Sequence, residues 1–426
     1  MTPGDAVSIL PPLQPDEARH GAAVLQAVRD AIATHGGWLA FDDYLRIVLY
    51  APGLGYYSAG SAKFGSSGDF VTAPELSGLF GRCVARQCAE VLQLGGGDVL
   101  ELGAGTGALA ASVLATLREL EVLPQHYYIL EVSADLRARA QQRVASLPEA
   151  LRARVRWLDA LPAAPIAGVI LANEVADALP FKRFVIASGE VLERGVAVSP
   201  QGELFEADRP ADAALRADIA GIAASLPAPW PPSSPVRAGL PAQWPWPSSS
   251  AAPSGSSAQW PWPGGYQSEL CPMLQPWIAA ISAVLRRGAA LIIDYGLARH
   301  EYYHPQRSGG TLRCHFRHRA HEDPLLYPGL QDISAWVDFT RVAEAAVDAT
   351  LAVAGYCTQA AFLLATGIES DLAAIGETLE RARLASQARQ LLLPGEMGET
   401  FKVMALTRGL DAPLFGFEYQ DLRRSL

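Results

Sequence analysis

The chain has 426 residues, which exceeds the usual range of about 100–200 residues for one domain. We therefore expect one large domain with additions, or two domains. No run reaches the roughly 18 consecutive apolar residues of a membrane span, and the net charge of −10 disfavours broad attraction to nucleic acid or anionic membranes. The first 21 residues lack a secretory signal pattern, and five scattered cysteines indicate reduced thiols, so we expect a cytoplasmic protein.

The N-terminal part, residues 1–75, is predicted to be a helical and lid-like segment. Amphipathic spacing predicts helices over residues 15–35 and Phe41–Tyr50. A stretch rich in glycine and aromatic residues follows, which favours a loop lying over another part of the molecule. Thr72 and Glu75 then have the spacing of a capping box before a helix from Leu76 to Leu92, although ligand contact would explain both residues equally well.

The central motif of the chain is a glycine-rich turn. An apolar strand pattern, Val99–Leu102, ends in glycines at alternate positions (Gly103, Gly105 and Gly107), and an alanine-rich helix pattern follows. This is the first unit of a doubly wound sheet, whose turn and helix N-terminus can hold an adenosyl or dinucleotide ligand. Glu101 narrows the choice, since a carboxylate there would repel a pyrophosphate but suits the cationic aminoacyl sulfonium end of S-adenosylmethionine.

Alternating strand and helix patterns predict an α/β fold: a doubly wound, Rossmann-like sheet of seven strands with an added N-terminal region and two long insertions. The predicted strands are Val99–Leu102, Tyr127–Glu131, Val155–Asp159, Gly168–Glu174, Ala289–Asp294, Thr358–Ala365 and Thr400–Thr407, and a helix is expected over Val342–Val353. The expected regions after residue 75 are a cofactor-binding half (76–180), an insertion (181–287), the fifth strand (288–296), a substrate-side excursion (297–338) and a C-terminal half (339–426).

The insertion has two textures. Residues Arg183–Glu206 alternate β-branched runs with glycines, which predicts hairpins. Residues 227–265 are rich in Pro, Ser and Trp and contain an exact repeat, because Ala-Gln-Trp-Pro-Trp-Pro occurs at 242–247 and again at 258–263. We expect a disordered or polyproline-like surface insert without an essential role, although Trp-Pro pairs could dock a partner. An amphipathic helix is expected from residue 267 to Arg287.

The second excursion holds five histidines and Cys314. Their spacing fits no standard zinc pattern, and the interleaved Arg313, Arg317 and Arg319 would repel a dication. We therefore expect no metal site.

Acidic residues at the ends of the predicted strands match the needs of an adenosyl ligand. Glu131, after the second strand, is placed to accept from ribose hydroxyls, and Asp159, after the third, is placed to accept from the adenine amino group. The reacting atom should lie near the fourth strand end, Asn173–Asp177. Solvated strand ends, or a helix cap at Asn173, are the structural alternatives.

Methyl transfer is an in-line displacement, so its catalysis is mostly positioning and charge balance. The fourth strand lacks the Asn/Asp-Pro-Pro-aromatic tetrad of many amino-methylating enzymes, because Asn173 is followed by Glu-Val-Ala. Glu174 and Asp177, three residues apart, would share one face of a helical turn. Two carboxylates there could hold a guanidinium by bidentate hydrogen bonds and concentrate lone-pair density on one nitrogen.

Several motifs together resemble the MidA family of S-adenosylmethionine-dependent methyltransferases with the class I fold. They are Gly53–Tyr57, Gly68–Ser77, Glu101–Gly107, Asn173–Pro180, Asp294–Gly296, Gly310–Cys314 and Gln331–Thr340. Mitochondrial members of that family are arginine methyltransferases required for respiratory complex I assembly. The resemblance covers nearly the whole chain except the 227–265 insert. This chain has Cys271 where relatives commonly have asparagine, and Trp336 where they commonly have histidine. These differences affect the inference about the substrate more than the inference about the cofactor.

The resemblance implies cofactor contacts by Gly103, Gly105, Glu131 and Asp159, and a substrate-side role for the Gly68–Ser77 segment and for Asn173, Glu174 and Asp177. Together with the sequence argument above, it gives the following expected site. Cofactor contacts are expected from Glu101, Gly103, Ala104, Gly105, Glu131, Asp159, Asn173 and Thr72; substrate contacts from Gly68, Phe70 and Glu75; and catalysis from Glu174, Asp177 and Asn173. The expected activity is methylation of a protein, on arginine, with S-adenosylmethionine as cofactor and a respiratory-complex or other assembly protein as substrate.

Two other functions fit parts of the pattern. A nicotinamide-dependent oxidoreductase could use the same turn, but Glu101 and the long interval from Gly103 to Glu131, beyond the roughly 20 residues expected, disfavour it. A non-catalytic assembly factor could bind the cofactor without turnover. The intact acidic pair Glu174 and Asp177 weakly disfavours that alternative.

Overall fold

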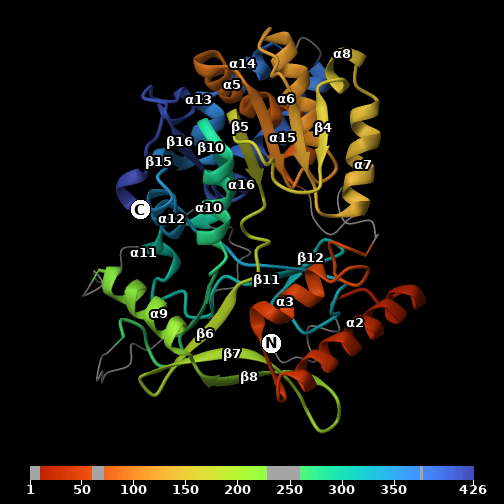
Figure 1. Cartoon of the computed structure of the whole chain (residues 1–426), viewed down its shortest axis with the longest axis vertical. Coiled ribbons are helices and arrows are strands. Elements are labelled where there is room, and N and C mark those ends of the chain that lie inside the picture. Colours follow the sequence, from red (N-terminus) through yellow and green to blue (C-terminus); the bar gives the residue numbers. More distant parts are fainter. Residues whose placement is uncertain (1–9, 60–71, 228–259, 375–377) are drawn as a thin grey trace.

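The computed structural model describes residues 10–59, 72–227, 260–374 and 378–426. Its main element is a mostly parallel sheet at one end of the molecule (Figure 1). The seven strands along this sheet are β2 (Asp98–Leu102), β3 (Tyr127–Leu130), β4 (Val155–Leu158), β5 (Ile166–Asn173), β10 (Leu285–Leu297), β15 (Ala352–Thr358) and β16 (Phe401–Arg408).

The order along the sheet is β15-β16-β10-β5-β2-β3-β4, and the short β14 (Val337–Asp338) pairs with the end of β10. Only β16 runs antiparallel to its neighbours along this path. The chain therefore winds outward in both directions from β2 and β5, and these two adjacent strands form the point where a doubly wound sheet opens a crevice for ligands. The predicted fold class is confirmed.

Helices cover both faces of this sheet, because successive residues of each strand alternate between two apolar cores. On β10, Leu291 packs with the core of α5 and α6, whereas Ile292 packs with the core of α10 and α12. The helices around this sheet are α4 (Ala73–Leu76), α5 (Gly78–Gly95), α6 (Ala108–Glu119), α7 (Ala134–Ala145), α8 (Glu149–Arg152), α10 (Leu274–Val284), α12 (Phe339–Asp348), α13 (Gln359–Ala365), α14 (Ile368–Ala373), α15 (Thr378–Leu392) and α16 (Met397–Thr400), with 3₁₀ turns η1 (Phe415–Phe417) and η2 (Arg423–Ser425).

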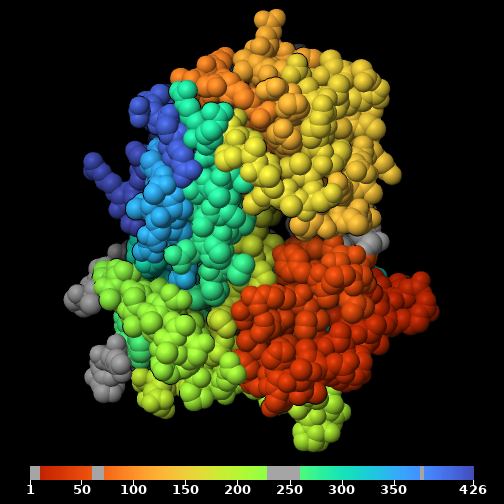
Figure 2. All heavy atoms as spheres, viewed as in Figure 1, coloured from red at the N-terminus to blue at the C-terminus, as the bar shows by residue number. Residues whose placement is uncertain are grey.

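A second, antiparallel sheet lies at the carboxyl-end side of the first, beside the N-terminal helices (Figures 1 and 2). Its order is β1-β7-β6-β9, with β8 also paired to β7. This part comprises α2 (Pro15–Thr34), β1 (Trp38–Ala40), α3 (Phe41–Tyr50), β6 (Lys182–Ala187), β7 (Glu190–Val198), β8 (Leu204–Pro210), α9 (Ala213–Ser225), β9 (Gln267–Leu270) and α11 (Arg299–Tyr302), and a third sheet of β11 (Arg313–Phe316), β12 (Arg319–His321) and β13 (Asp332–Ser334).

The N-terminal region and the insertion are joined by backbone pairing. Leu39 of β1 lies opposite Val196 of β7, so the first strand of the chain completes a sheet built mostly from the insertion. Sequence patterns did not predict this pairing, because it depends on partners that lie far apart in the chain.

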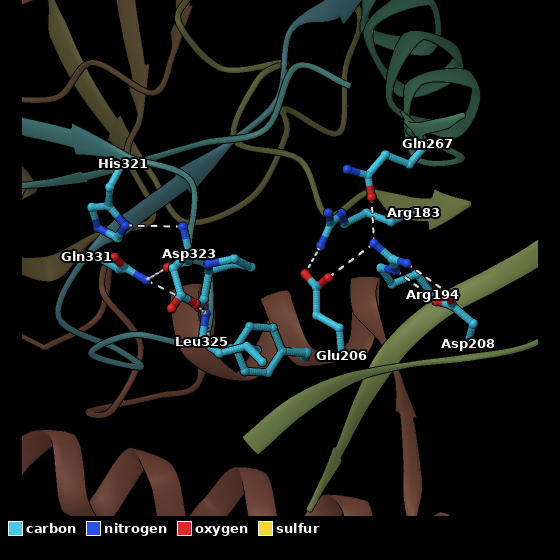
Figure 3. Close-up of polar contacts among 11 residues, drawn as sticks. Arg183, Arg194, Glu206, Asp208, Gln267, His321, Asp323, Leu325 and Gln331 are labelled. Atoms are coloured by element: carbon cyan, nitrogen blue, oxygen red, sulfur yellow. Dashed lines mark hydrogen bonds and ion pairs between the residues drawn. The ribbon is translucent and has the colours of Figure 1, made fainter. Parts of the chain in front are cut away.

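Ion pairs fix the strands of the second sheet in register (Figure 3). Arg194 of β7 contacts Asp208 of β8 at 2.8 Å and Gln267 of β9 at 2.5 Å, while Glu206 of β8 pairs with both Arg194 and Arg183. Because Arg183 is buried, these contacts also satisfy a guanidinium that burial would otherwise penalise.

Several predicted elements need correction. The predicted strand Thr358–Ala365 is instead helix α13, capped by Thr358, whose side chain accepts from the Ala361 N–H; the sixth strand is β15, immediately before it. The predicted helix over Val342–Val353 ends at Asp348. These errors share a cause, since short apolar runs do not distinguish a buried strand from a buried helix.

The helix predicted from residue 267 to Arg287 is shorter than expected. Residues Gln267–Leu270 form β9, and β10 begins at Leu285, so the helix is confined to α10 between them.

Two further corrections concern a helix break and the proline-rich insert. The predicted helix from Leu76 is interrupted at Ser77, whose side chain caps α5 by accepting from the Leu79 N–H. The C-terminal boundary of the predicted disordered insert, residue 265, is too late. Residues 260–265 belong to the described structure, and Trp262 is buried among aromatic rings. Residues 228–259 of the insert lie outside the described residues.

No helix within the described ranges is long and apolar enough to cross a bilayer.

The pairing of β1 with β7 yields a stability test at Gly195. A Cβ at this position would lie 2.3 Å from the Leu39 carbonyl oxygen, so Gly195→Ala should lower the free energy of unfolding by about 1–3 kcal/mol. Gly221→Ala on α9 is the control, because a Cβ there meets nothing within 4 Å and helix propensity favours alanine. Urea unfolding measures both; equal stability of the two variants would contradict the pairing.

Candidate functional site

The glycine-rich turn lies between β2 and α6 as predicted, and its backbone requires glycine. Gly103 has φ 65° and Gly105 has φ 56°, both in the left-handed region that L side chains rarely adopt. A Cβ on Gly103 would lie 2.9 Å from Val175, whereas a Cβ on Gly105 would meet nothing within 4 Å. The turn therefore packs against the β5 loop on one side and presents bare backbone to open space on the other.

This open space is a hollow of about 890 Å³, including its opening to solvent. It lies at the carboxyl ends of β2, β3 and β5, where the sheet order reverses. Its lining residues are Tyr57, Thr72, Pro74, Glu75, Glu101, Gly103, Ala104, Gly105, Thr106, Ala108, Leu109, Glu131, Val132, Leu136, Asn173, Glu174, Val175, Asp177 and Ala178. Five of these residues carry carboxyl groups, and none of them is Lys, Arg or His.

Most of the predicted site residues line this hollow, and they come from five separate parts of the chain. Asp159 is the exception: its side chain is 90% exposed, pairs with Arg137, and does not belong to the lining. The adenine contact assigned to Asp159 stays a prediction. The predicted substrate residues Gly68 and Phe70 lie outside the described residues.

Glu131 shapes the glycine turn directly. Its Oε2 accepts from the Gly105 N–H at 2.8 Å, and its Oε1 accepts from the Ser133 N–H at 2.8 Å. The carboxylate is buried, and because each carboxylate oxygen can accept two hydrogen bonds, a ligand hydroxyl can share it with these backbone donors. Glu131 therefore links the ends of β2 and β3 while still facing the hollow.

Glu101 is buried at the end of β2 and accepts from the Tyr127 hydroxyl at 2.6 Å. Burial raises the pKa of the Glu101 carboxyl to about 7, with a further contribution from the charge of Glu131, although the Tyr127 hydrogen bond acts in the opposite direction. A bound cation would favour the ionised form of this group.

Thr72 and Glu75 do not form the predicted capping box. The Thr72 side chain makes no cap hydrogen bond to α4. Glu75 instead accepts from Arg143 of α7 at 3.0 Å and from the Thr106 hydroxyl in the glycine turn. Glu75 thus links α4 to the glycine turn and to α7, and it also lines the hollow.

The segment after β5 carries the acidic pair, but it is a turn and not the helical face that spacing predicted. Glu174 has φ 53°, which ends the strand sharply after Asn173. Asp294, at the end of β10, holds the turn by accepting from the N–H groups of Ala176 at 3.0 Å and Asp177 at 3.2 Å. Glu174 and Asp177 both line the hollow despite this different backbone path.

The two carboxyls of the pair have raised pKa values. Burial, followed by repulsion from Asp177, raises the pKa of Glu174 to about 8, and burial, followed by repulsion from Asp332, raises that of Asp177 to about 7. Asn173 Nδ2 donates to Glu174 Oε1 at 3.0 Å, and the Tyr295 hydroxyl donates to Asp177 Oδ2. The buried oxygens Asn173 Oδ1 and Asp177 Oδ1 make no hydrogen bond within the described residues.

Sequence reasoning missed residues that surround this pair. Asp332 of β13 is buried and accepts from the Tyr57 hydroxyl at 2.7 Å, and Tyr57 lines the hollow. Tyr57 also stacks on Tyr50 with 5.4 Å between ring centroids. The signal was present in the Gly53–Tyr57 and Gln331–Thr340 motifs, but nothing in the sequence showed that these distant segments meet.

Comparisons with known proteins agree with this geometry. The family described as "Putative S-adenosyl-L-methionine-dependent methyltransferase" matches residues 83–357. A crystallised protein from Burkholderia thailandensis, bound to S-adenosyl-homocysteine, is 41% identical, with a TM-score of 0.86 and coverage of 98% of this chain and 100% of that one.

Curated relatives are more distant but span similar lengths. The mitochondrial protein arginine methyltransferase NDUFAF7 homolog of Drosophila melanogaster is 28% identical over 94% of this chain and 90% of its own length. The Danio rerio protein arginine methyltransferase NDUFAF7 is 26% identical over 87% and 83%. These likenesses favour methyl transfer over the oxidoreductase alternative.

The crowded carboxyls make stability depend on pH. Their pKa values are higher in the folded protein than the ordinary values of about 4, so the folded state binds more protons between about pH 4 and 8. The free energy of unfolding should therefore fall as pH rises from about 5.5 to about 8.5. Asp177→Asn removes one such group and should show a smaller fall, measured as the melting temperature at both pH values.

Glu190→Gln, on the exposed end of β7, is the matched control and should follow the wild type across this pH range. Parallel profiles for Asp177→Asn and the wild type would contradict the burial of an unpaired carboxyl at this position.

Proposed function

Because the chain belongs to this family of S-adenosyl-L-methionine-dependent methyltransferases, we propose that it methylates an arginine side chain of a protein substrate. The support for arginine is twofold. Similar curated proteins are named protein arginine methyltransferases, and the described residues that line the hollow include five acids and no Lys, Arg or His.

The hollow fits the cofactor on the evidence of its own residues. Open space at Gly105 allows close approach to the backbone, and the Glu131 carboxylate lies along the same wall. We assign the backbone of Gly103, Ala104 and Gly105 to the cofactor's amino acid and ribose parts and Glu131 to its ribose hydroxyls. We further assign Glu101 to the cationic end of the cofactor and Thr72, which also lines the hollow, to a cofactor contact. Bound S-adenosylmethionine supplies the methyl group on a sulfonium.

The proposal that the substrate is an arginine rests mainly on the acidic pair Glu174 and Asp177. A guanidinium presents five N–H donors, which suit the unpartnered oxygens of Asp177 and Asn173 together with the Glu174 carboxylate. These acceptors would orient one Nη atom toward the methyl group and offset the positive charge. Methylation of that nitrogen releases a proton. The pKa of Glu174 is about 8 in the empty site, and a bound guanidinium would lower it, so that Glu174 is ionised when substrate is bound and can accept this proton.

Tyr295 and Asp294 support the pair without touching substrate. Asp294 fixes the loop backbone, and Tyr295 fixes the orientation of the Asp177 carboxyl while its hydroxyl lies 2.8 Å from Ser334 Oγ. Both residues come from the end of β10, so the fifth strand sets the geometry of the fourth strand's loop.

For the substrate's identity we propose a respiratory-complex or other assembly protein, as the family resemblance implies. For location we propose the cytoplasm, supported by five cysteines that are all free.

The acidic pair is tested by Glu174→Gln, which keeps the shape of the side chain but removes its charge. Methyl transfer should fall roughly 10²–10³-fold, as for loss of one preorganised charge-stabilising group, while calorimetric affinity for S-adenosyl-homocysteine stays within about twofold. The assay uses labelled S-adenosylmethionine with protein extract from cells lacking this protein, and mass spectrometry locates the methyl group.

The Glu190→Gln variant again serves as control and should transfer methyl groups at the wild-type rate. Label on a residue other than arginine would overturn the substrate proposal, and unchanged transfer by Glu174→Gln would overturn the role of the pair.

Tyr57 permits a test that needs no protein substrate. Tyr57 lines the hollow together with Glu174 and Asp177, so we expect its ring to contact the cationic group of the donor, an interaction worth about 0.5–2 kcal/mol. Tyr57→Leu should lower the preference for S-adenosylmethionine over the neutral S-adenosyl-homocysteine by about 2–30-fold in calorimetry. Tyr57→Phe, which keeps the ring, should retain the preference; equal losses for both ligands in Tyr57→Leu would show a merely structural role.

A further inference from the structure

The Trp-Pro repeat has a structural counterpart that methyl transfer does not explain. Its second copy, Ala258–Pro263, ends in described residues, and these are packed against the second sheet. Trp262 is 5% exposed, and its indole N–H donates to the Tyr303 carbonyl at 2.7 Å. Trp260 is less buried and donates to the Gly189 carbonyl at 2.8 Å.

The surroundings of these two tryptophans form an aromatic groove, which we define by Phe184, Gly189, Tyr266 and Tyr303. Trp262 stacks on Tyr266 with 5.1 Å between centroids and an interplanar angle of 14°, and it contacts Phe184 at 6.0 Å and Tyr303 at 6.2 Å. Trp260 stacks on Trp262 in turn, at 6.5 Å. The aromatic groove thus recognises both indoles by their rings and by their N–H groups.

Proline completes the fit between this segment and the aromatic groove. The proline rings fix φ at about −65°, so less conformational entropy is lost when the segment docks, and in the docked second copy the backbone bends over Trp260–Trp262. Aromatic rings beside carbonyl acceptors provide both the apolar surface and the hydrogen bond that a buried indole needs. The second copy therefore behaves as a peptide ligand attached to its own binding site.

The first copy, Ala242–Pro247, has the same six residues and begins sixteen positions earlier. Every side chain and donor that the aromatic groove uses from the second copy is therefore present twice in the chain. Residues 227–243 separate Leu226, at the end of α9, from Trp244, and a segment of that length can span up to about 60 Å when extended. Closure entropy also changes slowly with loop length, so reach and loop cost do not prevent exchange.

We propose that the aromatic groove is a binding site for Trp-Pro-Trp-Pro segments and that the first copy is its second, intramolecular ligand. The two copies compete for one groove, and the first docks when the second is displaced. Gly264 and Gly265 follow only the second copy, and Gly265 N–H donates to the Ile186 carbonyl at 2.7 Å. This extra anchor gives the second copy the advantage in the unperturbed chain.

A double-mutant cycle in the full-length protein tests the exchange. Trp244→Ala with Trp246→Ala should leave the melting temperature within about 1 °C of wild type, because the first copy is not the favoured ligand. Trp260→Ala with Trp262→Ala should lower it moderately, since the first copy takes over. The quadruple variant should lose clearly more than the sum of the two pairs. Additive pairs would overturn the proposal.

A peptide-binding experiment measures the affinity of the aromatic groove directly. It also includes a substitute variant in case the quadruple variant folds poorly. The fluorescein-labelled peptide Ala-Gln-Trp-Pro-Trp-Pro should bind the quadruple variant saturably by anisotropy and bind wild type at least tenfold more weakly. The same peptide with both Trp replaced by Ala is the control. Trp260→Leu with Trp262→Leu, combined with the first-copy changes, replaces the quadruple variant if that variant no longer binds S-adenosyl-homocysteine.

Each outcome decides the proposal. Failure of the peptide to bind a variant that still binds S-adenosyl-homocysteine would overturn the groove as a site. Dimers of the Trp260→Ala/Trp262→Ala variant in size-exclusion chromatography would overturn the intramolecular ligand. None of these readouts depends on methyl transfer or its substrate.

Discussion

The site depends on a group of buried carboxyls around Asp177 that have no Lys, Arg or His partner among the described residues. Burial removes the water that would stabilise the charges of Asp177, Asp294 and Asp332. Repulsion from Asp332 further raises the pKa of Asp177, and repulsion from Asp177 further raises that of Asp294. Such an arrangement costs free energy in the empty protein. It persists because hydrogen bonds from tyrosine hydroxyls and backbone N–H groups hold each carboxyl in place, and the binding of a cation would offset the cost.

The carboxyl cluster is assembled by elements from distant parts of the chain. The β5 loop supplies the acidic pair, β10 supplies Asp294 and Tyr295, the excursion supplies Asp332, and the N-terminal region supplies Tyr57. Pairing of β1 with β7 joins the N-terminal region to the insertion, so both lie against the carboxyl ends of the main sheet. The N-terminal region, the insertion and the excursion are therefore needed to complete the candidate site.

The proposed cofactor side and the proposed substrate side of the hollow depend on different kinds of contact. Around the glycine turn, recognition rests on backbone conformation and on Glu131, which bonds the turn itself. Around Glu174 and Asp177 it rests on charge and on unpartnered acceptors. The first is a local property of a strand-turn-helix unit, whereas the second requires strands and loops that lie far apart in the chain.

This difference explains what could be predicted from the sequence. Apolar runs, alternate glycines and strand-end acids determined the doubly wound sheet, the turn and the residues Glu101, Glu131, Glu174 and Asp177, because each is encoded by neighbours within a few positions. Only the tertiary structure decided that Asp159 points to solvent, that Glu75 fastens α4, that Tyr57 and Asp332 meet beside Asp177, and that one Trp-Pro copy packs into an aromatic groove. These contacts join segments separated by tens to hundreds of residues, and local periodicity carries no information about which distant side chains will share a buried space.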